Sequence, residues 1–226
     1  MNTTSSTAIT GQATTRTASR RIPLGVKLGF TGFMAVLVPV YWASYGPTNF
    51  LYFCDAALFL TLTAIWTGHP LAASMAAVGI LLPQLVWVVD FACGCAGYHP
   101  IGLATYMFDP KIKLFARSLS LFHGWLPFLL IYLVSRLGYD RRALAGWTLL
   151  ATSLMLTSYF FLPPPTPESV HSSTPVNIDY VFGFSDTEPQ RWMNPHLFVT
   201  ALILAMPLCL YVPTHFLLRR LAPEAA

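Results

Sequence analysis

The stretch LAASMAAVGILLPQLVWVVDF, residues 71–91, carries no charged side chain before Asp90. A helix rises about 1.5 Å per residue, so roughly 20 apolar residues are needed to cross the ~30 Å hydrocarbon core of a bilayer. Backbone groups in lipid must pair within the chain, and the stretch lacks the apolar–polar alternation of a barrel strand. We therefore expect a membrane-spanning helix here.

Other stretches of similar character lie on both sides of this one. We expect spans at residues 26–44, 50–66, 71–91, 116–135, 143–162 and 196–218. The fold class predicted from them is all-α, a polytopic membrane protein. Residues 26–220 would form one bundle of six transmembrane helices.

The composition of the whole chain agrees with this class. Of 226 residues, 55% are hydrophobic and 10% are charged. Soluble domains carry about 25% charged residues, because a folded surface in water needs them. A soluble globular protein is thereby excluded, and the 14% aromatic content and four cysteines exclude a disordered chain and a disulfide scaffold.

Basic residues predict the orientation of the bundle, since cytoplasmic segments carry an excess of Lys and Arg. An N-in/C-in topology places nine basic residues inside and four outside. The inner ones are Arg16, Arg20, Arg21, Lys27, Arg136, Arg141, Arg142, Arg219 and Arg220, and the outer ones are Lys111, Lys113, Arg117 and Arg191. This asymmetry accounts for the net charge of +4, so we expect membrane lipids and no nucleic acid as partners.

The location that best fits this topology is a bacterial inner (plasma) membrane. Residues 1–25 are rich in Thr and Ser and contain no acidic residue. We interpret them as a disordered cytoplasmic tail, although such a composition is also typical of a targeting segment.

Two predicted outer loops, residues 92–115 and 163–195, are longer than most connections and are therefore candidates for function or for binding a membrane protein partner. The first contains Cys93, Cys95 and His99, which would suit a redox pair or a soft-metal site, or are incidental loop residues. Three ligands are too few for a structural zinc site. We therefore predict no metal and no cofactor.

Polar side chains are costly inside lipid and mark candidate functional positions. Cys54, Asp55, Asp90, Arg117 and His123 all fall in the outer third of the predicted bilayer, from their positions along helices that rise about 1.5 Å per residue. One hypothesis is structural: these groups pair with one another and hold the helices together.

The other hypothesis is catalytic. Cys54 would be a nucleophile and His123 its base, since a thiol attacks as thiolate. Asp55, Asp90 or Asn177 would orient the imidazole, as in a triad. Neighbouring helical residues point about 100° apart, which counts against Asp55 and leaves Asp90 or Asn177 open.

Two short motifs carry a resemblance to a known family. Through FCDAAL at residues 53–58, His123 in the fourth span and NIDYVF at residues 177–182, the chain resembles the YwaF-like bacterial membrane proteins. These are similar to eukaryotic androgen-induced hydrolases of branched fatty-acid esters and to an acyltransferase of ether phospholipids. The resemblance implies six spans, a nucleophile at or near Cys54 and a catalytic histidine at His123. The family pattern has a second asparagine where this chain has Asp179.

Three functions follow as hypotheses. The first is an intramembrane lipid-acyl hydrolase or acyltransferase, using Cys54 and His123 with donors from residues 177–180. The second is a non-catalytic accessory protein that binds a partner through the outer loops. The third is a proton- or ion-coupled transporter using Asp55, Asp90 and His123.

Overall fold

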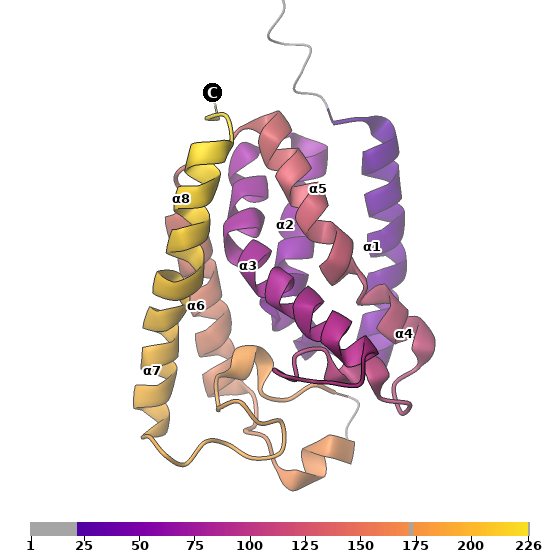
Figure 1. Cartoon of the computed structure of the whole chain (residues 1–226), viewed down its shortest axis with the longest axis vertical. Helices are drawn as coiled ribbons and strands as arrows, with labels where there is room; N and C mark the ends of the chain where they lie inside the picture. The colour runs from indigo at the N-terminus through magenta and orange to yellow at the C-terminus, as the bar shows by residue number, and fades with distance from the viewer. Residues whose placement is uncertain (1–21, 172–173, 226) are drawn as a thin grey trace, which may run out of the picture.

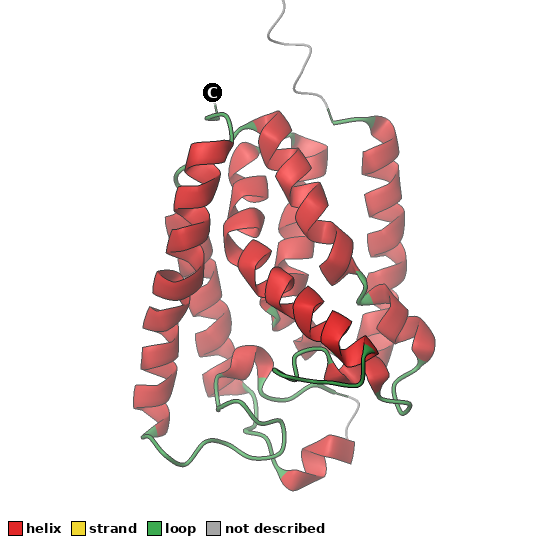
Figure 2. Ribbon diagram, in the orientation of Figure 1, coloured by secondary structure: helices red, strands yellow, loops and turns green. Residues whose placement is uncertain are grey.

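The computed structural model describes residues 22–171 and 174–225. Most of the predicted tail, with Arg16, Arg20 and Arg21, lies outside the described residues. The described chain folds into helices and loops, with one isolated backbone bridge between Tyr139 and Glu224 (Figure 2). The predicted all-α class is confirmed.

In residues 22–171 and 174–225, eight α-helices and five short helical turns follow one another (Figure 1). The α-helices are α1 (Leu24–Tyr45), α2 (Phe53–Thr67), α3 (Pro70–Cys95), α4 (Leu114–Leu119), α5 (Phe122–Leu137), α6 (Ala143–Phe161), α7 (Pro195–Met206) and α8 (Val212–Leu221). The short turns are η2 (Pro47–Leu51), η3 (Thr105–Phe108), η4 (Pro167–His171), η5 (Ile178–Tyr180) and the π-helical turn η6 (Pro207–Tyr211).

Five helical segments of the described chain are long and apolar enough to cross a membrane. They are α1, α3, α4 with α5, α6, and α7 with η6 and α8. The predicted second span is shorter, because α2 has 15 residues and extends about 22 Å. The prediction of six transmembrane helices therefore stays a prediction.

The two ends of the bundle differ in character (Figure 1). The end where α1 begins and α8 ends is called the terminal end, and the opposite end, which holds residues 96–113, 162–171 and 174–194, is called the loop-rich end. Both described ends of the chain thus lie at the same end of the bundle.

Helix α3 lies at the centre of the bundle, packed against α2, α5, α6 and α8. Its first half is built from small buried residues, among them Ala73, Ala76 and Ala77, and small residues allow helix backbones to approach closely. Gly79 is the closest approach: a Cβ added there would lie 1.9 Å from the Trp147 ring of α6. Residues 71–91 therefore form the core of the bundle as well as a candidate span.

The outer faces of the helices are apolar. Leu28, Phe128, Leu149 and Leu204, from α1, α5, α6 and α7, are all more than half exposed. Soluble proteins seldom expose such side chains in contiguous bands around the molecule. These faces fit a hydrocarbon solvent.

The predicted fourth span is interrupted. Ser120 and Leu121 separate α4 from α5, and the backbone N–H groups of Ser120, Leu121, His123 and Gly124 bond three residues back rather than four. The Ser120 carbonyl also accepts a hydrogen bond from the His123 ring. The break therefore lies at the residues that the sequence marks as functional candidates.

The loop after α6 folds back into the loop-rich end rather than lying free. Ile178 and Val181 are fully buried, and Asn177, Asp179 and Tyr180 have positive φ angles of 54–60°. Left-handed non-glycine residues cost about 1–3 kcal/mol each, which burial of Ile178 and Val181 offsets at about 1.5–3 kcal/mol each. Packing thus holds this strained turn in the bundle.

Candidate polar site at the loop-rich end

The site is built around the first turn of α2, which begins inside the bundle. The first backbone N–H groups of a helix have no partner within it and must be satisfied from outside. Here the Asp179 Oδ1 of η5 accepts from the Phe53 N–H at 3.2 Å. A residue 126 positions away in the chain therefore caps this helix.

A second carboxylate lies in the same turn. Asp55 is 2% exposed, and its Oδ2 accepts a hydrogen bond of 2.8 Å from Asn49 Nδ2. The Oδ1 of Asp55 and the Oδ2 of Asp179 are both buried, and neither has a hydrogen-bond partner within the described part of the chain. The two carboxyl groups lie within electrostatic range of each other, so they form a carboxylate pair.

The loop member of this pair holds its proton more tightly than a solvated aspartate. Burial raises the pKa of Asp179 well above its ordinary value, and the charge of Asp55 adds to the rise, whereas the hydrogen bond from Phe53 opposes it. A negative charge in the neighbourhood of a carboxyl group favours its protonated form. The carboxylate pair can therefore supply an acid and a base together.

Tyrosines and Ser120 surround the carboxylate pair. The Tyr41 hydroxyl and Ser120 Oγ are 2.6 Å apart, and Tyr41 and Tyr45 both interact electrostatically with Asp55. Tyr106 of η3 interacts with Ser120 and Cys54. We call this group the polar cluster; its members are Tyr41, Tyr45, Asn49, Cys54, Asp55, Tyr106, Arg117, Ser120 and Asp179.

Cys54 is a free, partly buried thiol in the polar cluster, and its strongest charged neighbours are Asp55 and Asp179. A helix N-terminus favours a thiolate, but two carboxylates repel one. The charged groups that act most strongly on the thiol are therefore negative, whereas most nucleophilic cysteines are activated by a positive neighbour.

His123 lies at the edge of the polar cluster. Its Nδ1 is 2.7 Å from the Ser120 carbonyl oxygen, and its ring stacks on Trp87 and Phe122 with centroid distances of 4.6 and 4.1 Å. A carbonyl only accepts, so Nδ1 carries the proton and Nε2 is left as the basic nitrogen of the neutral ring. The contacts of His123 therefore join it to Ser120 rather than to Cys54.

Two other predicted site residues organise loops. Asp90 accepts backbone hydrogen bonds from Ile101, Gly102 and Ala104 at 2.8–3.2 Å. Asn177 is 1% exposed; its amide donates to the Gly183 and Ser185 carbonyls, and its Oδ1 accepts from the Phe182 N–H. These hydrogen bonds occupy the side-chain oxygen and nitrogen atoms that Asp90 and Asn177 would need to orient an imidazole. Both residues therefore have a structural role, which is to hold loop backbone in place.

Further buried polar atoms at the loop-rich end have no hydrogen-bond partner. They include the Tyr45 hydroxyl, the Thr48 hydroxyl, Arg117 Nε, and both amide atoms of Gln84. Gln84 lies about level with Asp55, since α2 and α3 are antiparallel and turn between Thr67 and Pro70. Buried polar groups in proteins are nearly always paired, so these atoms are suited to bind a polar ligand or water.

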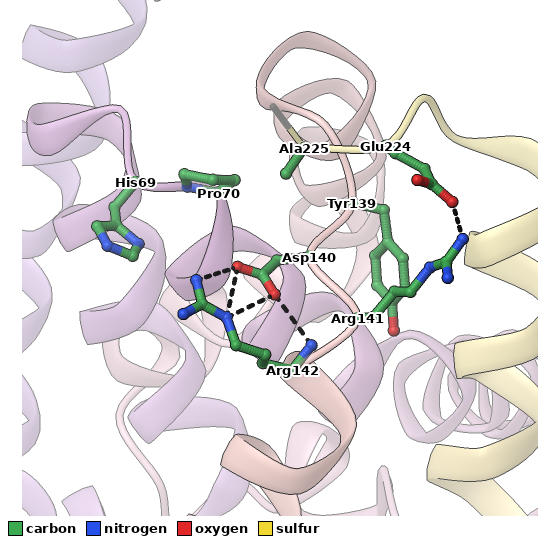
Figure 3. A pocket seen from close by; sticks show the side chains of 8 residues that line it. All are labelled: His69, Pro70, Tyr139, Asp140, Arg141, Arg142, Glu224 and Ala225. Carbon is green, nitrogen blue, oxygen red and sulfur yellow. Dashed lines mark hydrogen bonds and ion pairs between the residues drawn. The ribbon is translucent and has the colours of Figure 1, made fainter.

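A cavity of about 500 Å³ opens at the terminal end (Figure 3). Arg142 donates to Asp140 through Nη2 and Nε at 2.7 and 3.1 Å, and Arg141 pairs with Glu224. Because Arg142 satisfies the carboxylate of Asp140, the cavity offers less for chemistry than the polar cluster.

The Asp140–Arg142 pair predicts a pH dependence of stability. The hydrogen bonds from Arg142 lower the pKa of Asp140 in the folded state. The contribution of ionised Asp140 to the stability of the folded protein is therefore fully present above the pKa that an aspartate has in the unfolded chain, about 3.9. This contribution is lost as the pH falls through the lower pKa that Asp140 has in the folded state. We expect the melting temperature of the wild type in detergent to fall below about pH 4 by more than that of Asp140→Asn. Equal losses in the two proteins, with Glu188→Gln as an exposed control, would contradict this.

Among the described residues, no group of three or more His, Cys, Asp or Glu side chains is arranged so that it could hold a metal ion. Cys93 and Cys95 are free thiols at the end of α3.

The sequence predicted that Cys54, Asp55 and His123 lie at a similar depth in the membrane. The structure adds several residues to this site that were not predicted. Asp179, Asn49 and the three tyrosines enter the site through loop folding and helix packing, and only Gln84, a polar residue within an apolar stretch, carried a local signal. No family model matches the chain, and it has no significant match among curated proteins or solved structures.

Proposed function

We propose that the protein is an integral membrane enzyme that hydrolyses or transfers acyl groups of membrane lipid esters at the polar cluster. The observation that carries the proposal is the carboxylate pair, Asp55 and Asp179, whose free oxygens lie among unpartnered polar atoms at the loop-rich end. Such a site offers an acid, a base and hydrogen-bond donors close to one another. The resemblance of the 53–58 and 177–182 motifs to lipid-acyl enzymes adds support.

In the reaction that we propose, ester hydrolysis needs two proton transfers, and each carboxyl group of the pair performs one of them. Asp55, whose Oδ2 accepts a hydrogen bond from Asn49, takes a proton from a water that attacks the ester carbonyl, and Asp179 gives its proton to the departing alcohol. The oxyanion formed between these steps needs donors, for which the Gln84 amide and the Arg117 guanidinium are suited. An acceptor alcohol in place of water gives acyl transfer.

A thioester on Cys54 with His123 as base is the other route to the same products. The carboxylate neighbours of Cys54 and the ring contacts of His123 favour water activation over this route. In the route we favour, Cys54 and His123 shape the site and do not form a covalent intermediate.

Transport is disfavoured by the core between the polar cluster and the terminal end. Leu58, Ile65, Ile80, Leu130 and Leu133 are at most 1% exposed and fill this region. A proton or ion path needs polar groups or water along its length. The polar cluster is therefore better suited to a site than to a pathway.

A binding role remains the alternative. Tyr98, Ile101, Phe184 and Trp192 are exposed on the loops of the loop-rich end, and exposed aromatic residues are typical of interfaces. A membrane protein partner would contact these loops.

The location we propose is a bacterial inner membrane, with both termini in the cytoplasm. Lys27, Arg136, Arg142, Arg219 and Arg220 gather toward the terminal end, which supports a cytoplasmic position for it. Reporter fusions after Arg142 and after residue 226 would both signal inside; an outside signal at either would contradict this orientation.

The test of the enzyme uses purified protein in detergent and phospholipids with labelled acyl chains. We expect wild-type protein to release fatty acid, and Cys54→Ala and His123→Ala to retain activity within about tenfold, since neither performs the proton transfers. Loss of activity in both variants, with a labelled thioester trapped on Cys54 in wild type, would favour the thioester route. Absence of acyl release by wild-type protein would contradict the proposed function.

A further inference from the structure

A second site lies on the other side of the molecule, between α6 and α8. An open groove of about 720 Å³ runs there, and its floor is one face of α6, with Ala145, Thr148 and Thr152, extended by Arg141 just before the helix begins. Residues at these spacings share one helical face. From residue 141 to residue 152 the groove is about 16 Å long.

The groove has a cationic end and an apolar body. Arg141, Arg219 and His215 lie at the end closest to the terminal end, and His215 is within electrostatic range of both guanidinium groups. Leu144 and Leu149 flank the small residues of the body. A charged end joined to an apolar channel matches one class of molecule, an amphiphile with an anionic head.

The basic groups are positioned to bind an anion. The Tyr139 hydroxyl is 2.6 Å from His215 Nδ1, which fixes the ring and leaves Nε2 as the nitrogen that can bind a ligand. Arg141 pairs with Glu224, but both side chains are more than half exposed, and exposed pairs contribute little. Arg219 has no carboxylate partner among the ion pairs of the described residues.

We propose that this groove binds an acidic phospholipid of the leaflet at the terminal end. Its phosphate contacts Arg141, Arg219 and His215 Nε2, and one acyl chain lies along Ala145, Thr148 and Thr152. Arginine is well suited to phosphate because its guanidinium donates two parallel hydrogen bonds. Basic clusters just beyond the apolar part of a helix recognise acidic lipids in the same way.

The test measures lipid binding to delipidated protein in detergent, by native mass spectrometry and by melting temperature. Phosphatidylglycerol should bind and raise the melting temperature, and phosphatidylcholine with the same acyl chains should bind at least about tenfold more weakly. The double variant Arg141→Gln with Arg219→Gln should lose this preference. Arg220→Gln, on the same helix but outside the groove, should keep it.

Two further measurements separate binding of the lipid headgroup from binding of the lipid acyl chain. Ala145→Trp fills the groove at an exposed position and should abolish phosphatidylglycerol binding without changing elution on size exclusion. Soluble glycerol 3-phosphate should leave the melting temperature unchanged. The proposal is overturned if the double Arg variant keeps the preference, if glycerol 3-phosphate stabilises as well as the lipid does, or if crosslinking shows a second copy of the chain in the groove.

Discussion

Asp55→Asn should lower the rate of acyl release by about 10²–10⁴-fold while the protein keeps its melting temperature within a few degrees. The asparagine has the same size and still accepts the hydrogen bond from Asn49, so the first turn of α2 keeps its packing. It cannot take a proton, so the attacking water is no longer activated. Initial rates of fatty-acid release, with phospholipid in excess, measure the effect.

The control for this prediction is Asp109→Asn, which removes a carboxylate from a loop of the loop-rich end without touching the polar cluster. It should hydrolyse lipid at the wild-type rate. If Asp55→Asn retains full activity, or if Asp109→Asn loses as much, the carboxylate pair is not the acid and base.

The other member of the pair should appear in the pH profile. Because burial raises the pKa of Asp179, the wild type should be active where Asp179 is protonated and should lose activity as the pH rises through that raised value. In Asp179→Asn this alkaline limb should disappear, along with most of the rate, since the amide donates a hydrogen bond but no proton. An unchanged alkaline limb in this variant would assign the limb to another group.

The largest effect on stability should come from Gly79→Ala. A Cβ at residue 79 would lie 1.9–2.4 Å from three atoms of the Trp147 ring, which is fully buried between α3 and α6. Such overpacking costs about 1–3 kcal/mol or more, because either the indole or a helix must move. We expect a fall in melting temperature of about 2–4 °C for each kcal/mol, measured in detergent by intrinsic fluorescence.

A matched glycine provides the control. Gly32 lies within α1, and a Cβ there would meet nothing within 4 Å. Gly32→Ala should therefore leave the melting temperature unchanged or raise it slightly, because alanine favours helix by up to about 1 kcal/mol. Combining Gly79→Ala with Trp147→Phe should restore part of the loss, since the smaller ring leaves room. A Gly79→Ala protein as stable as Gly32→Ala would show that α3 and α6 do not pack this closely.

Trp147 connects the contact between α3 and α6 with the first turn of α2. Its ring packs on Phe53 at a centroid distance of 6.0 Å and on Tyr211 at 6.2 Å, and Phe53 is the residue that Asp179 caps. A displaced indole would therefore disturb the first turn of α2. We expect Gly79→Ala to lower acyl release as well, by less than Asp55→Asn does.

The sequence alone predicted the helical class and most helix positions, because each depends on local hydropathy over about 20 residues. The stretch at 71–91 lies within α3, and the stretch at 143–162 nearly coincides with α6. The sequence could not predict that α2 is short or that the helix over residues 116–135 is interrupted at Ser120. Those features depend on hydrogen bonds to residues remote in the chain, such as Asp179 and Tyr41.

Within the candidate site, the sequence determined which polar residues lie in the loop-rich half of the helices, since depth follows from position along a helix. Only the tertiary structure decided how they combine. It showed that Asp90 and Asn177 hold loop backbone, brought Asp179 toward Asp55 across 124 positions and set His123 against Trp87. The physical reason is that depth is a local property of the chain, whereas side-chain partners are decided by helix packing and by a loop whose buried apolar residues hold it inside the bundle.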